Sequence, residues 1–206
     1  MNKSEITFLD GPHSRLQELK FTILTMVEFI RAFRAMHFIG PCITIFGSAR
    51  FKEDHPFYAL TREAASQFAK LGFTILTGGG PGLMEAANRG AKEVGGRSMG
   101  CNIQLKTEQM PNPYLDKWIY VKHFFLRKVL LVKYSFAFVV MPGGFGTMDE
   151  YFEALTLIQT RKIDNFPVII FGKEYHKSLI GHIDEMKRNS TIGAEDTGLF
   201  LVTGSI

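Results

Sequence analysis

The segment MPGGFGTMDE, which ends at Glu150, contains residue types that could bind a phosphate group and act on the ligand that carries it. It lies between an apolar, strand-like run and a helical pattern that begins near Thr147. Free N–H groups at the start of a helix bind phosphate, and Gly143, Gly144 and Gly146 let the backbone approach a ligand because they have no Cβ. Glu150 follows one helical turn later. The segment therefore predicts a phosphate site with a carboxylate beside it.

The same residues also fit a simpler interpretation. Thr147 and Glu150 form the pattern T-x-x-E of a capping box, in which the hydroxyl accepts a bond from the Glu150 N–H and the carboxylate accepts one from the Thr147 N–H. On spacing alone, a functional carboxylate and a helix cap both remain open.

Two further glycine-bearing turns follow predicted strands, FGSAR at 46–50 and TGGGPG at 77–82. In a parallel sheet the carboxyl ends of the strands lie along one edge, and ligands bind where the strand order reverses. We therefore expect the three turns to converge on one site, although each turn could simply connect a strand to a helix. The phosphate or substrate contacts predicted on these two turns are Gly47, Ser48, Gly79 and Gly80.

Spacing disfavours the common dinucleotide and ATP motifs. The third glycine position of G-x-G-x-x-G holds Glu85 in one turn and Asp149 in the other, and the pair Gly172-Lys173 is followed by Glu174 instead of Ser or Thr. A mononucleotide or a sugar phosphate fits these shorter turns better than NAD or ATP.

Strand and helix patterns alternate along the chain. The apolar runs are continuous, as in strands covered on both faces, so we expect them to be parallel and central. The pattern predicts an α/β fold, a Rossmann-like, doubly wound, mostly parallel sheet with helices on both faces. The predicted strands are 42–46, 73–76, 99–103, 118–121, 136–141 and 168–171, and the predicted helices are 56–71, 83–94, 122–134, 147–161 and 175–188.

An extra N-terminal helix precedes the first strand. We interpret 1–206 as a single domain, with a helical extension at 1–40 and a nucleotide-binding core at 41–206. The helix is apolar nearly all round, so it must be buried, either against its own sheet or against a second subunit in a homodimer or higher homo-oligomer. Its repeating apolar residues are Leu16, Leu19, Ile23, Met26, Ile30 and Phe33.

Composition limits the partners and the compartment. The net charge of +4 favours a small anionic ligand, but the basic residues form no run of five or more, which disfavours nucleic acid. The charges within the N-terminal helix disfavour a membrane span. Cys42 and Cys101 provide neither a disulfide framework nor a metal pair, which favours the reducing cytoplasm. The six histidines show no ligand spacing, so we expect no metal.

Three segments together resemble a known family: GGGPGLMEAANRGA at 78–91, FFLRK at 124–128 and PGGFGTMDE at 142–150. They resemble the LONELY GUY family of nucleoside 5′-monophosphate phosphoribohydrolases, long mislabelled as lysine decarboxylases. The resemblance covers roughly 41–171. It implies a Rossmann-like homo-oligomer of AMP nucleosidase type, which hydrolyses AMP-like nucleotides to a free base and ribose 5-phosphate. Activation of cytokinin riboside monophosphates is one such reaction.

The resemblance also implies roles for individual residues. Arg127 and Glu150 match the catalytic pair of the family, and Lys128 matches its partner basic residue. Glu108 and Thr156 match substrate contacts. The phosphate-binding turn corresponds to Gly143, Gly144, Gly146 and Thr147.

General chemistry supports the same pair. Hydrolysis of an N-glycoside develops positive charge on the ribose, which a carboxylate such as Glu150 can stabilise while it activates water. Arg127 stays protonated and can neutralise phosphate or donate a hydrogen bond to the departing base. This reaction requires no cofactor. Arg127 and Lys128 could also belong to an ordinary solvated helix face.

Two other functions remain open. A Rossmann-like carrier or sensor could hold a nucleotide or a phosphorylated cofactor on the same turns without cleaving it. A pyridoxal-dependent decarboxylase would need a Schiff-base lysine in a suitable setting, and no lysine of the chain stands out in that way.

Overall fold

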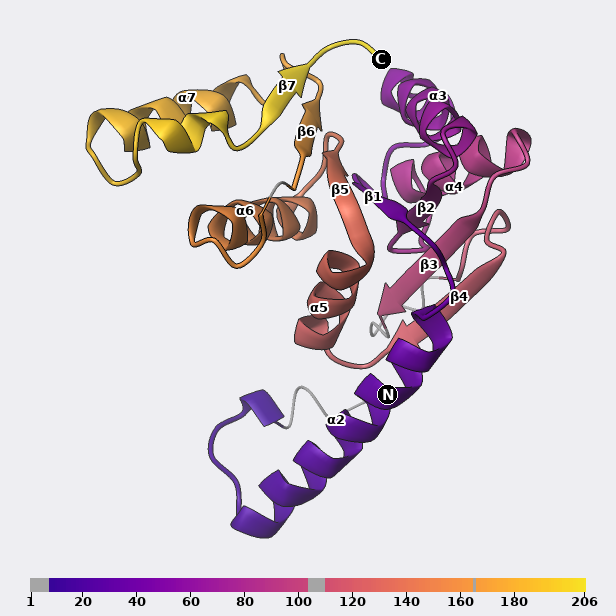
Figure 1. The fold of residues 1–206 in the computed structure, drawn as a ribbon, viewed down its shortest axis with the longest axis vertical. Helices are drawn as coiled ribbons and strands as arrows, with labels where there is room; N and C mark the ends of the chain where they lie inside the picture. The colour runs from indigo at the N-terminus through magenta and orange to yellow at the C-terminus, as the bar shows by residue number, and fades with distance from the viewer. Residues whose placement is uncertain (1–7, 104–109, 165) are drawn as a thin grey trace.

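The computed structural model describes residues 8–103, 110–164 and 166–206. Its strands form one all-parallel sheet in the order β4-β3-β2-β1-β5-β6-β7 (Figure 1). The first strand, β1, lies inside the sheet, and β2, β3 and β4 follow it in order toward one edge. The chain then returns, so that β5 pairs with the other side of β1. The predicted Rossmann-like, doubly wound sheet is thus confirmed, with its switch point between β1 and β5. The strands are β1 (Cys42–Phe46), β2 (Thr74–Thr77), β3 (Ser98–Ile103), β4 (Lys117–Val121), β5 (Ser135–Val140), β6 (Val168–Phe171) and β7 (Leu201–Thr203).

Two strands depart from the sequence expectation. We expected the 118–121 run to be a central strand, but β4 lies at the edge of the sheet and exposes Trp118 and Tyr120. The expectation was wrong because a continuous apolar run does not reveal whether a neighbouring strand exists. The last strand, β7, was not predicted, since its three residues are only partly buried and are too short for a pattern.

Helices cover both faces of the sheet, as predicted (Figure 1). Helices α3 and α4 pack on one face against side chains such as Ile43 and Ile45 of β1. Helices α2, α5, α6 and α7 contribute to the core on the other face, where Cys42 and Phe46 of the same strand point. The alternation within β1 follows from the two-residue repeat of a strand. The helices are α2 (Arg15–Met36), α3 (Pro56–Lys70), α4 (Leu83–Glu93), α5 (Phe124–Tyr134), α6 (Phe145–Gln159) and α7 (Lys177–Arg188), with a short 3-10 turn, η1, at Glu195–Gly198.

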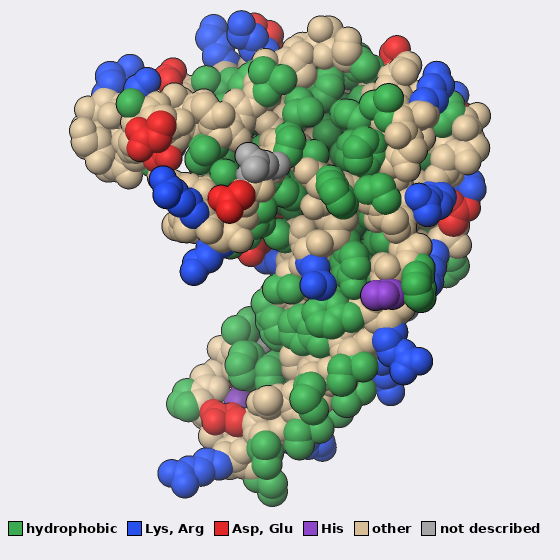
Figure 2. Space-filling view, viewed as in Figure 1, with side chains coloured by type: hydrophobic (Ala, Val, Ile, Leu, Met, Phe, Trp, Pro, Cys, Tyr) green, Lys and Arg blue, Asp and Glu red, His purple; other side chains and the backbone are tan. Residues whose placement is uncertain are grey.

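Helix α2 confirms the predicted N-terminal helix but is not buried over its whole length. It begins after Ser14, whose capping box with Gln17 satisfies free N–H groups, and it projects away from the sheet (Figure 1). Only its C-terminal part reaches the core, through Ala32 and Met36. The apolar row nearer the N-terminus is exposed, so our expectation of burial is not met within the single chain. Figure 2 shows hydrophobic side chains along this projecting helix.

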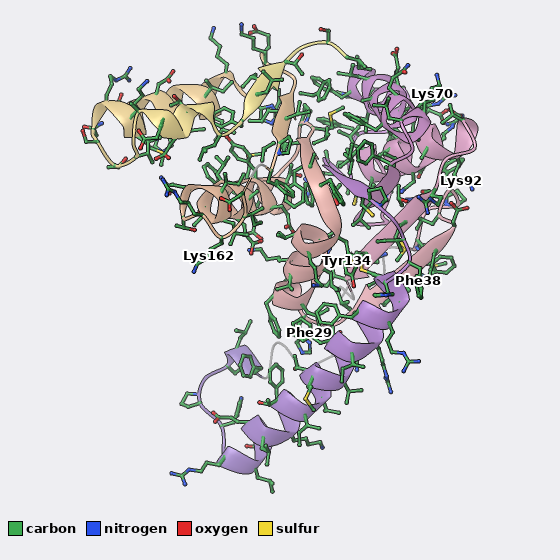
Figure 3. All side chains as sticks on the ribbon, in the orientation of Figure 1. Phe29, Phe38, Lys70, Lys92, Tyr134 and Lys162 are labelled. Carbon is green, nitrogen blue, oxygen red and sulfur yellow. The ribbon has the colours of Figure 1, made fainter. Side chains whose placement is uncertain are left out.

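A polar anchor and aromatic contacts hold α2 against α5. Glu28 accepts a hydrogen bond from the Lys122 N–H, and its other oxygen lies 2.9 Å from Nδ1 of His123, the N-cap of α5. The Tyr134 hydroxyl at the other end of α5 donates to the Phe33 carbonyl at 3.3 Å. Tyr134 and Phe29 both lie at this junction (Figure 3). No helix in the described residues is long and apolar enough to cross a membrane.

A buried polar network shapes the turn after β2. The Asn88 side chain of α4 accepts bonds from the Thr77 hydroxyl at 2.7 Å and the Asn112 amide at 2.9 Å, and it donates to Ser98 at 2.8 Å. The Asn112 side chain also donates to the Gly80 carbonyl at 3.0 Å. Because buried polar groups are costly to leave unpaired, Asn88 orients the whole turn.

We expect Asn88→Ala to lower the free energy of unfolding by about 3 kcal/mol, because it leaves buried partners on β2 and β3 unsatisfied. Urea denaturation followed by circular dichroism measures the loss. The matched control is Asn189→Ala at the exposed end of α7, which should cost less than about 1 kcal/mol. Equal losses in the two variants would contradict the role of the network.

Candidate active site

The glycine turns after β1, β2 and β5 meet around one cavity of about 600 Å³ at the switch point of the sheet. Hydrogen bonds join the turns, since the Ser48 N–H donates to the Pro142 carbonyl at 3.0 Å and the Leu83 N–H donates to the Ser48 carbonyl at 2.9 Å. Gly82 has a φ of 70°, and a Cβ there would collide with the backbone of Ser48 and Ala49. The described residues that line the cavity are Ile45, Phe46, Gly47, Ser48, Ala49, Arg50, Phe51, Gly78, Met84, Asn102, Ile103, Phe124, Arg127, Gly143, Gly144, Phe145, Gly146, Thr147, Glu150 and Tyr175.

Helix α6 starts two residues earlier than predicted, at Phe145 instead of Thr147. Its N-cap is Gly144, and no side chain among the described residues caps the helix. The capping-box interpretation is therefore wrong, because Thr147 already lies in the first turn and its hydroxyl packs against Gly143, where a Cβ would collide with it. The first N–H groups of α6 have no carbonyl partner within the helix and border the cavity, as a phosphate site requires.

Glu150 projects from the second turn of α6 into this cavity. Its side chain is buried, with 4% exposure, and its Oε2 atom has no hydrogen-bond partner among the described residues. Burial raises the pKa of Glu150 to about 7, while the positive charge of Arg127 opposes the rise and the carboxylate of Glu153 adds to it. Near neutral pH this carboxyl can therefore both accept and release a proton.

Arg127 reaches the cavity from α5. Its Nε donates to the Cys101 carbonyl at the end of β3 at 3.1 Å, which fixes the side chain. A Cβ on Gly78 would collide with the guanidinium and with the Met84 sulfur, so a larger residue there would displace the Arg127 side chain from this position. Sequence analysis assigned Gly79 and Gly80 in this turn and missed Gly78.

Gly79 and Gly80 do not line the cavity in the described structure. The Gly79 N–H donates to Thr77 Oγ1 at 2.9 Å, and its carbonyl accepts the Asn112 N–H at 3.0 Å. With Gly80 bound to the Asn112 side chain, these two glycines shape the turn that presents Gly78. Their predicted contact with a ligand stays a prediction.

Three further predicted residues lie elsewhere or are not described. Lys128 is turned toward α6, where its Nζ lies 3.0 Å from Asp149 and 3.3 Å from Glu153. Partial burial lowers its pKa, but these carboxylates outweigh burial and raise it above the usual value. The Thr156 hydroxyl donates to the Phe152 carbonyl at 2.8 Å and lines a separate groove between α6 and α7. Glu108 lies outside the described residues.

Sequence analysis did not assign several residues that line the cavity. Tyr175 follows β6 and donates its hydroxyl to the Gly143 carbonyl at 2.9 Å, which supports the turn before α6. Arg50 follows β1, and Asn102 lies at the end of β3. Each of them lies near the carboxyl end of a strand, so the rule that predicted the glycine turns could also have found these polar residues.

The two cysteines and the acidic residues form no metal centre in the part of the chain that the structure describes. Cys42 and Cys101 are free and buried, and burial raises the pKa of each thiol. No group of three or more His, Cys, Asp or Glu side chains among the described residues could hold a metal ion.

Comparison with known proteins finds relatives that are named as enzymes of nucleotide 5′-monophosphates. The model of a family described as "Possible lysine decarboxylase" matches residues 84–205. A cytokinin riboside 5′-monophosphate phosphoribohydrolase of Mycobacterium tuberculosis is 32% identical over 99 residues, which cover 47% of this chain and 53% of that protein. A pyrimidine/purine nucleotide 5′-monophosphate nucleosidase of Escherichia coli is 25% identical over 171 residues, which cover 77% of this chain and 37% of that one. The matched regions thus span about half and about a third of these relatives.

Solved structures with the same fold include carriers of a cofactor. A molybdenum cofactor binding protein of Rippkaea orientalis superposes with a TM-score of 0.60 at 22% identity, covering 80% of this chain and 90% of that one. The Moco carrier protein of Chlamydomonas reinhardtii superposes with a TM-score of 0.56 at 25% identity, again covering 80% of this chain and 90% of that one.

The raised pKa of Glu150 predicts a stability effect. The folded protein holds this proton more tightly than the unfolded chain, so the stabilisation is complete below pH 4.5 and is lost as pH rises through about 7. Replacing the carboxyl by an amide removes this loss. We therefore compare the free energy of unfolding of Glu150→Gln with that of wild type. The difference should change by about 3 kcal/mol in favour of the variant between pH 4 and pH 8.

Urea denaturation of both proteins across this pH range measures the difference. The matched control is Glu174→Gln in the exposed loop after β6, for which the difference from wild type should stay flat. A flat difference for Glu150→Gln as well would contradict a buried, proton-binding carboxyl.

Proposed function

The chain belongs to the LONELY GUY family, whose model carries the description "Possible lysine decarboxylase", and we propose from this premise that it hydrolyses nucleoside 5′-monophosphates. The bond cleaved is the N-glycosidic bond of AMP-like nucleotides, and the products are a free base and ribose 5-phosphate. The observation that carries the proposal is the Glu150 carboxyl. It is buried, one of its oxygens has no hydrogen-bond partner among the described residues, and it lies one turn inside a helix whose start suits a phosphate.

The proposed binding mode follows from the cavity. The 5′-phosphate lies at the start of α6, where the N–H groups and the helix dipole favour negative charge and where Gly143, Gly144 and Gly146 leave room for it. The ribose then lies toward Glu150, and the base lies toward Arg127 and Phe124. A cavity of about 600 Å³ is of the size that encloses ligands of this kind.

The proposed reaction uses Glu150 as base and Arg127 as electrostatic partner. Glu150 accepts a proton from a water molecule as the water oxygen bonds to C1′ of the ribose. The C1′–N bond breaks, its electron pair stays on the base nitrogen, and that nitrogen takes up a proton, so that the elements of water are divided between base and ribose. The Glu150 carboxylate also stabilises the positive charge that develops on the ribose, and Arg127 donates a hydrogen bond to the departing base.

A carrier function is the second candidate, because the Chlamydomonas carrier shares the fold at 25% identity. A carrier would hold a nucleotide or a phosphorylated cofactor in the same cavity without bond cleavage. An unpaired, buried carboxyl beside a phosphate weakens such binding through charge repulsion, so Glu150 favours catalysis over storage. Decarboxylation is not supported, because no lysine lines the cavity in the described part of the chain and a Schiff base would need one.

We expect purified protein given AMP to release adenine and ribose 5-phosphate, measured by chromatography. Glu150→Gln and Arg127→Ala should each lower kcat by roughly a hundredfold or more, while Glu150→Gln retains nucleotide binding. Because Glu150 acts as a base, kcat/KM should rise with pH through about 7.

A panel of nucleoside monophosphates, including prenylated and deoxyribose forms, identifies the preferred substrate. Tight AMP binding without release of a base from any member of the panel would favour the carrier. Near-normal turnover of Arg127→Ala would remove Arg127 from the reaction.

We also propose that the exposed face of α2 packs against a second copy of the chain. Leu16, Leu19, Ile23, Met26 and Ile30 are each about half exposed or more, and a groove beside them is lined by Phe21, Phe29 and Phe33. An apolar surface of this kind is unfavourable in water and typically marks an interface.

Light scattering coupled to size-exclusion chromatography should find a dimer or a higher oligomer, and Ile23→Asp should shift it toward the monomer. Lys20→Asp, a change on the same helix outside the apolar row, is the control and should leave the assembly intact. A monomeric wild-type protein would overturn this part of the proposal.

A further inference from the structure

Few of the described side chains that face the cavity are charged. Among the described residues, the charged side chains in its lining are Arg50, Arg127 and Glu150. A nucleoside monophosphate brings about two negative charges on its phosphate near neutral pH. The start of α6 supplies only partial positive charge. We therefore expect at least one side-chain cation to bind the phosphate as well.

The two cations predicted from sequence already have other contacts. Lys128 is bound to Asp149 and Glu153 and does not line the cavity in the described structure. Arg127 is fixed by its bond to the Cys101 carbonyl, and its charge acts on Glu150, whose pKa it lowers against the effect of burial. A cation on another element would leave Arg127 to act on Glu150 and on the departing base.

Arg50 has the position for this role. It lies on the turn after β1, which is bonded directly to the turn before α6 because the Ser48 N–H donates to the Pro142 carbonyl at 3.0 Å. The Arg50 N–H donates to Ser48 Oγ at 3.1 Å, which fixes the backbone of the turn. None of the ion pairs among the described residues involves its guanidinium, and Arg50 is exposed at the cavity. An arginine in this setting can bind phosphate through two parallel hydrogen bonds.

We propose that Arg50 binds the 5′-phosphate of the ligand, and that it thereby makes the site prefer nucleotides over nucleosides. This inference rests on the proposed function for the identity of the ligand. Arg50, on the turn after β1, adds a side-chain cation to the N–H groups of α6, while Arg127 and Glu150 serve the glycosidic bond.

Two measurements on Arg50→Ala and Arg50→Lys test the inference. The first is the Kd of ribose 5-phosphate by calorimetry, and the second is the kinetics of AMP and of adenosine. We expect Arg50→Ala to raise the Kd of ribose 5-phosphate and the KM of AMP at least about tenfold, with kcat changed less than about threefold. The kinetics of adenosine, which lacks the phosphate, should not change. Arg50→Lys should recover part of the affinity, because it keeps the charge without the planar fork.

Lys52→Ala is the matched control, since it removes the same charge from the same exposed loop at a residue that does not line the cavity. It should leave both Kd and KM unchanged. An unchanged Kd in Arg50→Ala, or an equal rise in Lys52→Ala, would overturn the role of Arg50.

The two proposals fail in different ways. If the wild-type protein binds ribose 5-phosphate but releases no base from any nucleotide, the hydrolase proposal fails while the Kd values still decide the role of Arg50. If it hydrolyses AMP and Arg50→Ala does so with the same KM, only the Arg50 inference is overturned. A wild-type protein that neither binds ribose 5-phosphate nor hydrolyses nucleotides would overturn both.

Discussion

This site depends on close packing at the carboxyl end of the sheet. The backbone of the glycine turns there contacts both side chains and the backbone of neighbouring turns. A Cβ at Gly82 would collide with the turn after β1, one at Gly143 with the Thr147 side chain, and one at Gly78 with the Arg127 guanidinium. A larger residue would push two turns apart at Gly82 and would displace the Arg127 or Thr147 side chain at the other two positions. The Asn88 network then holds the middle turn by satisfying its buried polar groups.

This packing brings the buried carboxyl of Glu150 close to the positive charge of Arg127. A carboxyl buried on α6 raises the energy of its own ionised form, and Arg127, reaching in from α5, offsets only part of that cost. The result is a titratable group poised near neutral pH beside a helix start that attracts anions. Burial of the ionised carboxyl lowers the stability of the folded protein, at the same place where it favours binding and proton transfer. Such a loss of stability is common at functional sites.

The elements around the site were accessible to sequence analysis to different degrees. The β1 run and the turn before α6 were predicted because buried parallel strands produce continuous apolar segments that end in glycine. The edge position of β4 was not accessible, since edge and centre differ in neighbours that lie far along the chain. At Thr147 the local spacing fitted both a helix cap and a functional site, and the structure removes the cap because α6 begins earlier, with Gly144 at its N-cap position.

The sequence by itself determined the fold class, the three turns and the candidate pair Arg127 and Glu150, because these depend on local periodicity and on motifs. Only the tertiary structure decided which neighbouring cation faces the cavity. Successive residues on a helix point about 100° apart, so Arg127 turns inward and Lys128 turns toward α6. Gly78 is recognised as part of the site only in three dimensions, where the turn after β2 meets the Arg127 side chain of α5.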